Sequence, residues 1–249
     1  MSSDGYRFRH VAEMEWIKLR TLRSTWWTLA LTTLSAVAIA AAVGVNTEDG
    51  SADLTNNALA GIAPGLLSIG LLGVLTATNE YTSGLIRSTL VTVPSRRRVA
   101  AAKSVVFGTV ALAVGEGTAF VAFVVGTLSL PSAIERPSVA DPRVLRAVVL
   151  AGIGIVLIGL IGLGLGLAIR HTPAAVGVLV GGVYVVAQLI GAVSPSAAGY
   201  VPVSIVANSL STSQPMDGMP SPWTGLVVLL VYTTVALGIG GWLLERRDA

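Results

Sequence analysis

The stretch AVVLAGIGIVLIGLIGLGLGLAI, from Ala147 to Ile169, contains no charged residue. An apolar helix of about 20 residues is long enough to span the hydrocarbon core of a bilayer. The whole chain has the same character: 53% of its 249 residues are hydrophobic, 12% are charged and the mean hydropathy is +0.77. Soluble domains carry about 25% charged residues. The composition therefore argues against a soluble protein and indicates one that lipid surrounds.

Similar apolar stretches lie on both sides of this one, at 25–45, 58–78, 104–130, 174–193 and 223–244. Their residues do not alternate with a period of two, which argues against a membrane β-barrel. A helix satisfies its own backbone hydrogen bonds inside lipid. The sequence therefore predicts an all-α, polytopic membrane protein with six transmembrane helices in one domain, residues 1–249. The first apolar stretch is too long for a cleaved signal peptide.

The distribution of Lys and Arg predicts the topology, because these residues accumulate in cytoplasmic loops. With six spans and both termini inside, 13 of the 16 Lys and Arg residues lie inside. The three outside are Arg136, Arg143 and Arg146, and the other two outside loops, 46–57 and 194–222, contain none. We therefore expect both termini in the cytoplasm. This bias also explains the pI of about 9.6, so we expect no nucleic-acid partner.

Several kinds of site are not expected in this chain. It has no Cys and two His, which leaves little for a metal site. A P-loop requires Gly before a Lys that Ser or Thr follows. Lys18 precedes Leu19, and Lys103 has Ala102 and Arg97 at the glycine positions. We expect no catalytic residue, no metal and no cofactor in this chain.

The loop between the second and third spans, residues 80–103, is the longest cytoplasmic one. One interpretation is a topogenic loop whose basic residues anchor it to anionic lipid: Arg96, Arg97, Arg98 and Lys103. The other is a docking segment for a cytoplasmic partner, formed by Glu80, Gly84, Leu85, Ile86, Arg87, Leu90 and Pro94. Apolar side chains between a Gly and a Pro favour docking, because charge alone does not require them. We expect Glu80 to pair with an Arg of this loop or of the partner.

The chain resembles the permease subunit of type-2 ATP-binding-cassette transporters, which are mostly exporters, and especially permeases of Gram-positive actinobacteria. The likeness covers nearly the whole chain. It lies in the segment EWIKLRTLRSTW (15–26) before the first span, the block 80–103, the turn Arg170-His171-Thr172 and the end Glu245-Arg246-Arg247. It implies a location in the bacterial cytoplasmic membrane.

The resemblance also implies an assembly. Residues 8–23 are then an interfacial connecting helix, and Glu80–Pro94 contains the coupling helix that docks on a separate P-loop ATPase, which binds ATP and Mg. Two permeases, as a homodimer or a pair of similar chains, complete the unit. One residue departs from the pattern: Glu15 falls between Val11 and Leu19 on the helical wheel, where an in-plane helix has an apolar stripe.

Glu116 is the ionisable residue deep inside a predicted span, between Gly115 and Gly117. A charge at that depth is costly and suggests function, although a carboxyl group buried between packed helices is the alternative. For the segment 195–213 two interpretations stay open: a short helix or re-entrant piece, or an ordinary loop. Two other functions also stay open: an ion-coupled carrier acting alone, with Glu116 as its relay, and a membrane anchor or assembly protein that transports nothing.

Overall fold

The computed structural model describes residues 7–48, 50, 53–93, 95–212 and 219–247. Helices and connecting loops make up this part of the chain, and no strand occurs in it. The helices are α1 (Phe8–Thr21), α2 (Arg23–Val45), α3 (Leu54–Ala58), α4 (Ile62–Thr82), α5 (Leu85–Thr92), α6 (Arg96–Leu128), α7 (Pro142–Ile169), α8 (Thr172–Val180), a π-helix (Gly181–Val185), α9 (Val186–Val193), α10 (Pro195–Ala198), α11 (Pro202–Ser209) and α12 (Pro222–Arg246). The predicted all-α fold class is confirmed.

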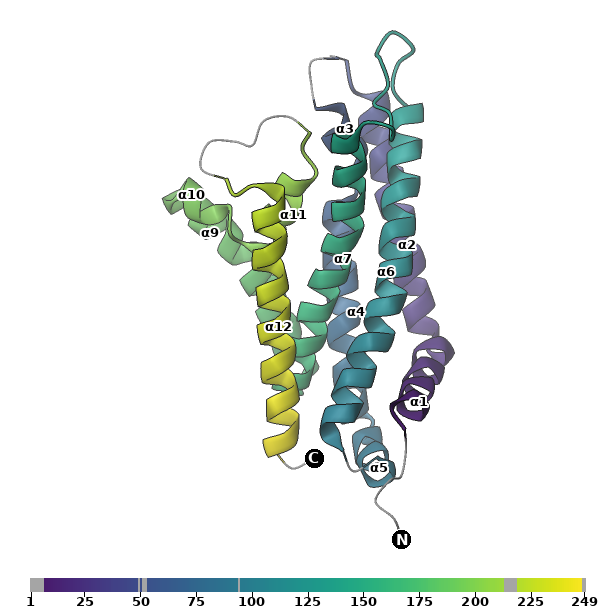
Figure 1. Ribbon diagram of the computed structural model, residues 1–249, viewed down its shortest axis with the longest axis vertical. Helices are drawn as coiled ribbons and strands as arrows, with labels where there is room; N and C mark the ends of the chain where they lie inside the picture. The colour runs from purple at the N-terminus through teal and green to yellow at the C-terminus, as the bar shows by residue number, and fades with distance from the viewer. Residues whose placement is uncertain (1–6, 49, 51–52, 94, 213–218, 248–249) are drawn as a thin grey trace.

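Five helices are long and apolar enough to cross a membrane: α2, α4, α6, α7 and α12. They run along the long axis of the molecule (Figure 1). The fifth predicted stretch, at 174–193, is helical but divided among α8, the π-helix and α9, since the α-helical hydrogen-bonding pattern is interrupted at 181–185. The structure therefore has the character of a multi-pass membrane protein, and the count of six spans stays a prediction.

Helix α7, which contains the apolar stretch 147–169, is the central helix and is mostly buried, whereas α12 is mostly exposed. The glycines of α7 and α4 bring the backbones of these two helices into contact. A Cβ atom at Gly73 would overlap with the carbonyl oxygen of Gly159, and one at Gly162 with the carbonyl oxygen of Gly70. Small residues allow this close packing between membrane helices. These glycines fix the α4–α7 core of the bundle.

Several helix boundaries differ from the predicted spans: helix α7, for example, begins at Pro142 rather than at 147, and helix α4 ends at Thr82 rather than at 78. Helix α6 begins at Arg96 rather than at 104, because the basic segment continues the helix. The stretch expected at 58–78 is divided into the short helix α3 and helix α4, which begins at Ile62. The open question at 195–213 is answered for its described part, which contains the short helices α10 and α11.

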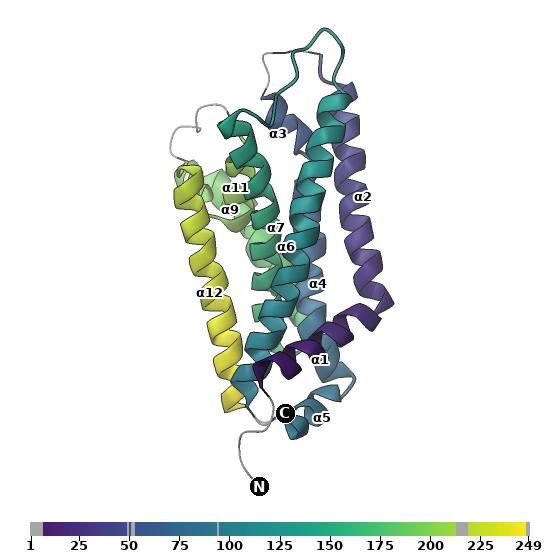
Figure 2. The same cartoon turned by 45° about the vertical axis from the view of Figure 1, so that its right-hand side comes forward.

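One end of the bundle, called here the basal end, contains α5, the first turns of α6 and the last turns of α4 and α12. Both described ends of the chain lie there (Figures 1 and 2). Helix α1 crosses α6 obliquely toward the start of α2 (Figure 2), and Leu22, in an extended conformation, separates α1 from α2. The predicted N-terminal helix thus exists as a separate element packed on the bundle.

Candidate functional site

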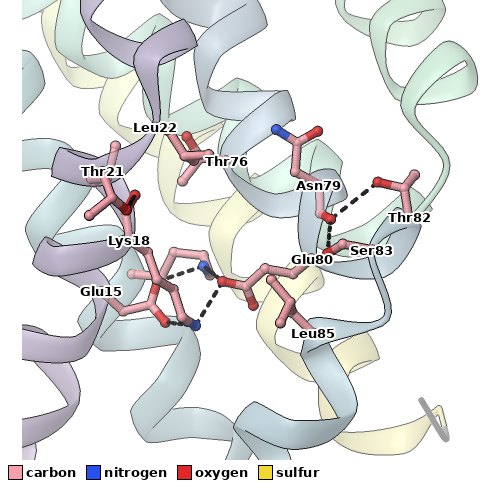
Figure 3. Close-up of a pocket in the computed structure, with 12 residues that line it drawn as sticks. Glu15, Lys18, Thr21, Leu22, Thr76, Asn79, Glu80, Thr82, Ser83 and Leu85 are labelled. Carbon is pink, nitrogen blue, oxygen red and sulfur yellow. Dashed lines mark hydrogen bonds and ion pairs between the residues drawn. The ribbon is translucent and has the colours of Figure 1, made fainter.

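Four charged side chains from three helices meet at the basal end and form what we call the tetrad: Glu15 and Lys18 of α1, Glu80 of α4 and Lys103 of α6 (Figure 3). The Lys103 ammonium group donates to Glu15 Oε2 at 2.6 Å and to Glu80 Oε1 at 2.7 Å. Lys18 donates to Glu15 Oε1 and to Glu80 Oε1, both at 2.9 Å. Each lysine therefore bridges both carboxylates.

The tetrad is enclosed by protein. The exposed fractions of the side chains are 2% for Glu15 and Lys103, 8% for Glu80 and 27% for Lys18. Its two positive and two negative charges cancel. Burying ions is costly unless they are paired, and removing one partner from a buried pair costs about 3–5 kcal/mol. The tetrad therefore requires all three helices to keep their relative positions.

The sequence positions these groups by simple rules. Glu15 and Lys18 are three residues apart, which places them on adjacent turns of one helix face. Glu15 is buried together with Val11 and Leu19. The carboxylate that interrupted the apolar stripe therefore faces the bundle, because Lys103 lies opposite it. This contact explains the departure from the amphipathic pattern.

Helix α5 is attached directly to the tetrad. The third hydrogen bond of the Lys18 ammonium group goes to the Thr89 hydroxyl at 3.2 Å. Gly84 precedes α5 with φ of +73°, a left-handed conformation that turns the chain from α4 into α5 and that glycine adopts without strain. The tetrad and Thr89 together connect α1, α4, α5 and α6.

The predicted docking residues separate into two groups. Ile86 is buried and Leu90 is partly buried, packed on a small cluster with Val11 and Val99. Leu85 and Arg87 are both exposed, on different faces of α5. Pro94 lies outside the described residues. Glu80 belongs to the tetrad, and its partners within the described part of this chain are the two lysines and not an Arg of the loop. Its pairing with an Arg of a partner protein stays a prediction.

The predicted basic anchor is also corrected in part. Lys103 cannot reach lipid, because it is buried between two carboxylates. The Arg96 guanidinium group donates to the carbonyl oxygens of Leu244, at 3.0 Å, and Arg247, at 2.7 Å. Arg97 forms an ion pair with Glu245. Both arginines therefore hold the end of α12 on α6, and Arg98 is exposed.

Arg170, which the sequence marked only as part of a tight turn, has a structural role. It ends α7 in a left-handed conformation, with φ of 62°. Its guanidinium group donates to the Leu243 carbonyl oxygen at 3.1 Å and lies 5.2 Å from the centre of the Tyr81 ring. Basic groups near the last carbonyl groups of a helix are favourable. Arg170 thus joins the basal ends of α4, α7 and α12.

A pocket of about 370 Å³ lies beside the tetrad, between the α1–α2 corner and the end of α4. Its lining includes Leu19, Leu22, Asn79 and Leu85 as well as the tetrad (Figure 3). Sequence reasoning missed both the pocket and the tetrad. Two signals were available in the sequence. The Glu15 carboxylate falls on an apolar face of its helix, and Lys103 directly precedes an apolar stretch.

Glu116 is not part of this site. It is half-buried on α6, with its carboxyl group over Gly152 of α7, where a Cβ atom would overlap with it. Thirteen residues of helix separate it from Lys103, or about 20 Å at 1.5 Å per residue. The Glu116 carboxyl group occupies the space left by the absence of a side chain at Gly152.

No protein-family model matches the chain, and no curated protein sequence shows significant similarity to it. Among the described residues, no group of three or more His, Asp or Glu side chains lies close enough together to hold a metal ion. The geometry of the basal end therefore carries the functional argument.

Proposed function

We propose that this chain is the membrane-spanning permease subunit of an ATP-binding-cassette exporter, driven by a separate cytoplasmic P-loop ATPase. One observation carries the proposal. A short helix, α5, lies between two long apolar helices, and the tetrad and Thr89 connect it to α1, α4 and α6. A displacement of α5 by a docked partner is therefore transmitted to three helices together.

The exposed side chains of α5 define the face that a partner contacts. Val91 is 82% exposed, and Arg87, four residues before it, is exposed on the same face of α5. Leu85, which is 55% exposed, lies at the other edge of the helix and lines the pocket beside the tetrad. A few apolar side chains usually dominate the affinity of an interface. Val91 thus supplies affinity and Arg87 supplies alignment. Ile86 and Leu90 hold α5 on the bundle instead.

In this proposal the ATPase binds ATP and Mg, and its cycle favours one state of the permease and then the other. A partner shifts such an equilibrium by as much as its affinities for the two states differ. Glu80 Oε1 accepts from both lysines, whereas Oε2 is buried without a hydrogen-bond partner in the described part of the chain. Glu80 Oε2 can therefore accept a hydrogen bond from a lysine of the tetrad, so the tetrad can exchange hydrogen bonds as α5 moves.

The proposed setting is the bacterial cytoplasmic membrane, with the basal end in the cytoplasm and two copies of the permease in the assembly. The placement of both described chain ends and the basic helix termini at one end of the bundle supports this orientation. It agrees with the accumulation of Lys and Arg in cytoplasmic segments.

The test is whether the chain co-purifies with a P-loop ATPase from the same cells and stimulates ATP hydrolysis by that enzyme. A gene for such an ATPase beside this one would identify the candidate partner. We expect Arg87→Glu and Val91→Asp to reduce capture and stimulation, because each adds negative charge to the docked face. Val45→Asp is the control, since Val45 is 65% exposed at the opposite end. Normal capture by both α5 variants in a correctly inserted protein contradicts the proposal. Transport that needs no ATPase and is lost in Glu116→Gln supports a carrier acting alone.

A further inference from the structure

The pocket beside the tetrad combines two chemical surfaces. Leu19, Leu22 and Leu85 form apolar walls, and the tetrad forms a charged floor. Ligand pockets in proteins have volumes of about 300–1,000 Å³, mostly apolar walls and a few placed polar groups. The volume of about 370 Å³ and this lining fit that description. A ligand matched to it has an apolar portion and a polar head.

The charge of the head follows from the exposure of the tetrad. Lys18 is 27% exposed, against 8% or less for the other three side chains. The most accessible side chain of the neutral tetrad is therefore a basic one. The carboxamide of Asn79, at the edge of the pocket, adds a donor group (Figure 3). An anionic head is favoured over a cationic one.

One bond of Lys18 is suited to exchange. Its contacts with Glu15 and Glu80 are charge-assisted and 2.9 Å long, whereas its bond to the neutral Thr89 hydroxyl is 3.2 Å long. Hydrogen bonds between ions are shorter and stronger than those to neutral groups. An anionic oxygen from a ligand is a better acceptor than Thr89 and can replace it without breaking either ion pair.

We propose that this pocket is a binding site for an amphipathic anion, with a phosphate or carboxylate head at Lys18 and Asn79 and an alkyl chain along the leucine walls. The site is a property of the permease chain alone and does not depend on the ATPase.

Cysteine protection tests the site, since the chain contains no native Cys. Ser83→Cys places a thiol in the pocket lining, and Ser88→Cys places one on the exposed side of α5, outside that lining. Each purified variant, in nanodiscs of zwitterionic lipid, is alkylated by a maleimide with and without dodecyl phosphate. At ten times the Kd we expect labelling of the Ser83→Cys variant to slow about tenfold, by mass action, and labelling of the Ser88→Cys variant to stay unchanged.

Two further probes separate the parts of the ligand. Dodecyltrimethylammonium has the same chain and the opposite charge, and inorganic phosphate has the head without the chain. We expect neither to protect the Ser83→Cys variant at the concentration at which dodecyl phosphate does. Equal protection by the cation overturns the anionic preference, equal protection by inorganic phosphate overturns the apolar part, and no protection by dodecyl phosphate overturns the site.

Charge reversal of the pocket gives a second test. Lys18→Gln leaves two carboxylates with Lys103 alone, so the tetrad becomes negative. In the Ser83→Cys background this variant should be protected by the cation and no longer by dodecyl phosphate, whereas Lys18→Arg should keep the original preference. Leu22→Trp, which fills the pocket without changing its charge, should remove protection by either probe. Unchanged preference in the correctly folded Lys18→Gln variant contradicts the assignment of the head to Lys18.

Discussion

Lys103 Nζ lies 2.6 Å from Glu15 Oε2, although the two residues are 88 positions apart and each side chain is 2% exposed. This pair attaches the N-terminal helix to the start of α6. Without it, α1 has a carboxylate on the face that packs against the bundle. The position of α1 is thus set by a specific ionic contact as well as by apolar packing.

The first prediction concerns this pair. Lys103→Met leaves two buried carboxylates with Lys18 alone, so it should reduce the free energy of unfolding by about 3–5 kcal/mol. The double variant Glu15→Gln/Lys103→Met should lose less than the sum of the two single variants, with a coupling of about 0.5–3 kcal/mol. Unfolding in detergent micelles measures both. Arg20→Met, at an exposed position of α1, is the control, and an equal loss there contradicts the prediction.

Gly84 provides a test of backbone strain. No atom lies within 4 Å of a Cβ placed there, and φ is +73°. Gly84→Ala should therefore cost about 1–2 kcal/mol through conformation alone. Gly117 has the same open surroundings but lies inside helix α6. Gly117→Ala should instead stabilise by up to about 1 kcal/mol. Thermal unfolding of the two variants compares them, and equal effects would be inconsistent with the left-handed turn.

The α4–α7 contact predicts a third result. Gly73→Ala and Gly162→Ala each push a methyl group into the backbone of the facing helix, and overpacking of this kind costs about 1–3 kcal/mol. We expect lower unfolding temperatures and lower yields of folded protein. Gly177→Ala, inside α8 with no atom within 4 Å of the added Cβ, should melt no lower than the parent chain. Similar melting of all three variants would show that the helices separate easily.

Glu116 and Gly152 should be energetically coupled. Gly152→Ala places a methyl group against the Glu116 carboxyl group, so it should destabilise the chain. Glu116→Ala removes that carboxyl group and should relieve the effect of Gly152→Ala in the double variant. Residues in contact show couplings of about 0.5–3 kcal/mol. Unfolding of the single and double variants measures the cycle, and additive effects would place Glu116 away from α7.

Topology gives the fifth prediction. Ser88→Cys on α5 and Ser138→Cys in the loop between α6 and α7 lie at opposite ends of the bundle, and both positions are exposed. With the basal end in the cytoplasm, a membrane-impermeant maleimide applied to intact cells should label Ser138→Cys and leave Ser88→Cys unlabelled until the cells are broken. The reverse pattern would place both termini outside.

The apolar stretches were sufficient to predict the class of fold and most of its long helices, because hydropathy over 20 residues reports directly on membrane spans. Hydropathy did not locate the start of helix α6, because charged residues extend that helix beyond the apolar stretch. Arg96 begins α6 well before the apolar stretch. Hydropathy also could not show that the fifth stretch contains a π-helix, since it does not distinguish a π-helix from an α-helix.

The tetrad could not be predicted, because its members are far apart in the chain. The sequence placed Lys103 among lipid anchors and treated Glu15 as a flaw in the amphipathic pattern. In the structure, Glu15 and Lys103 form one ion pair, because α1 lies against α6. Helix α5 lies within the segment that the sequence suggested for docking, but which of its residues face outward depends on how Ile86 and Thr89 pack.

The separation between Glu15 and Lys103 also has a consequence for biosynthesis. When α1 leaves the ribosome, Glu15 and Lys18 have only each other as partners, and Glu80 and Lys103 are made later. The two lysines and two carboxylates can assemble only after α4 has been inserted and α6 has begun to follow it. Docking of the first helix is therefore a late event in the maturation of the chain. A protease site placed between α1 and α2 should be cleaved readily in ribosome-bound chains that end before Lys103 and resist cleavage in longer ones.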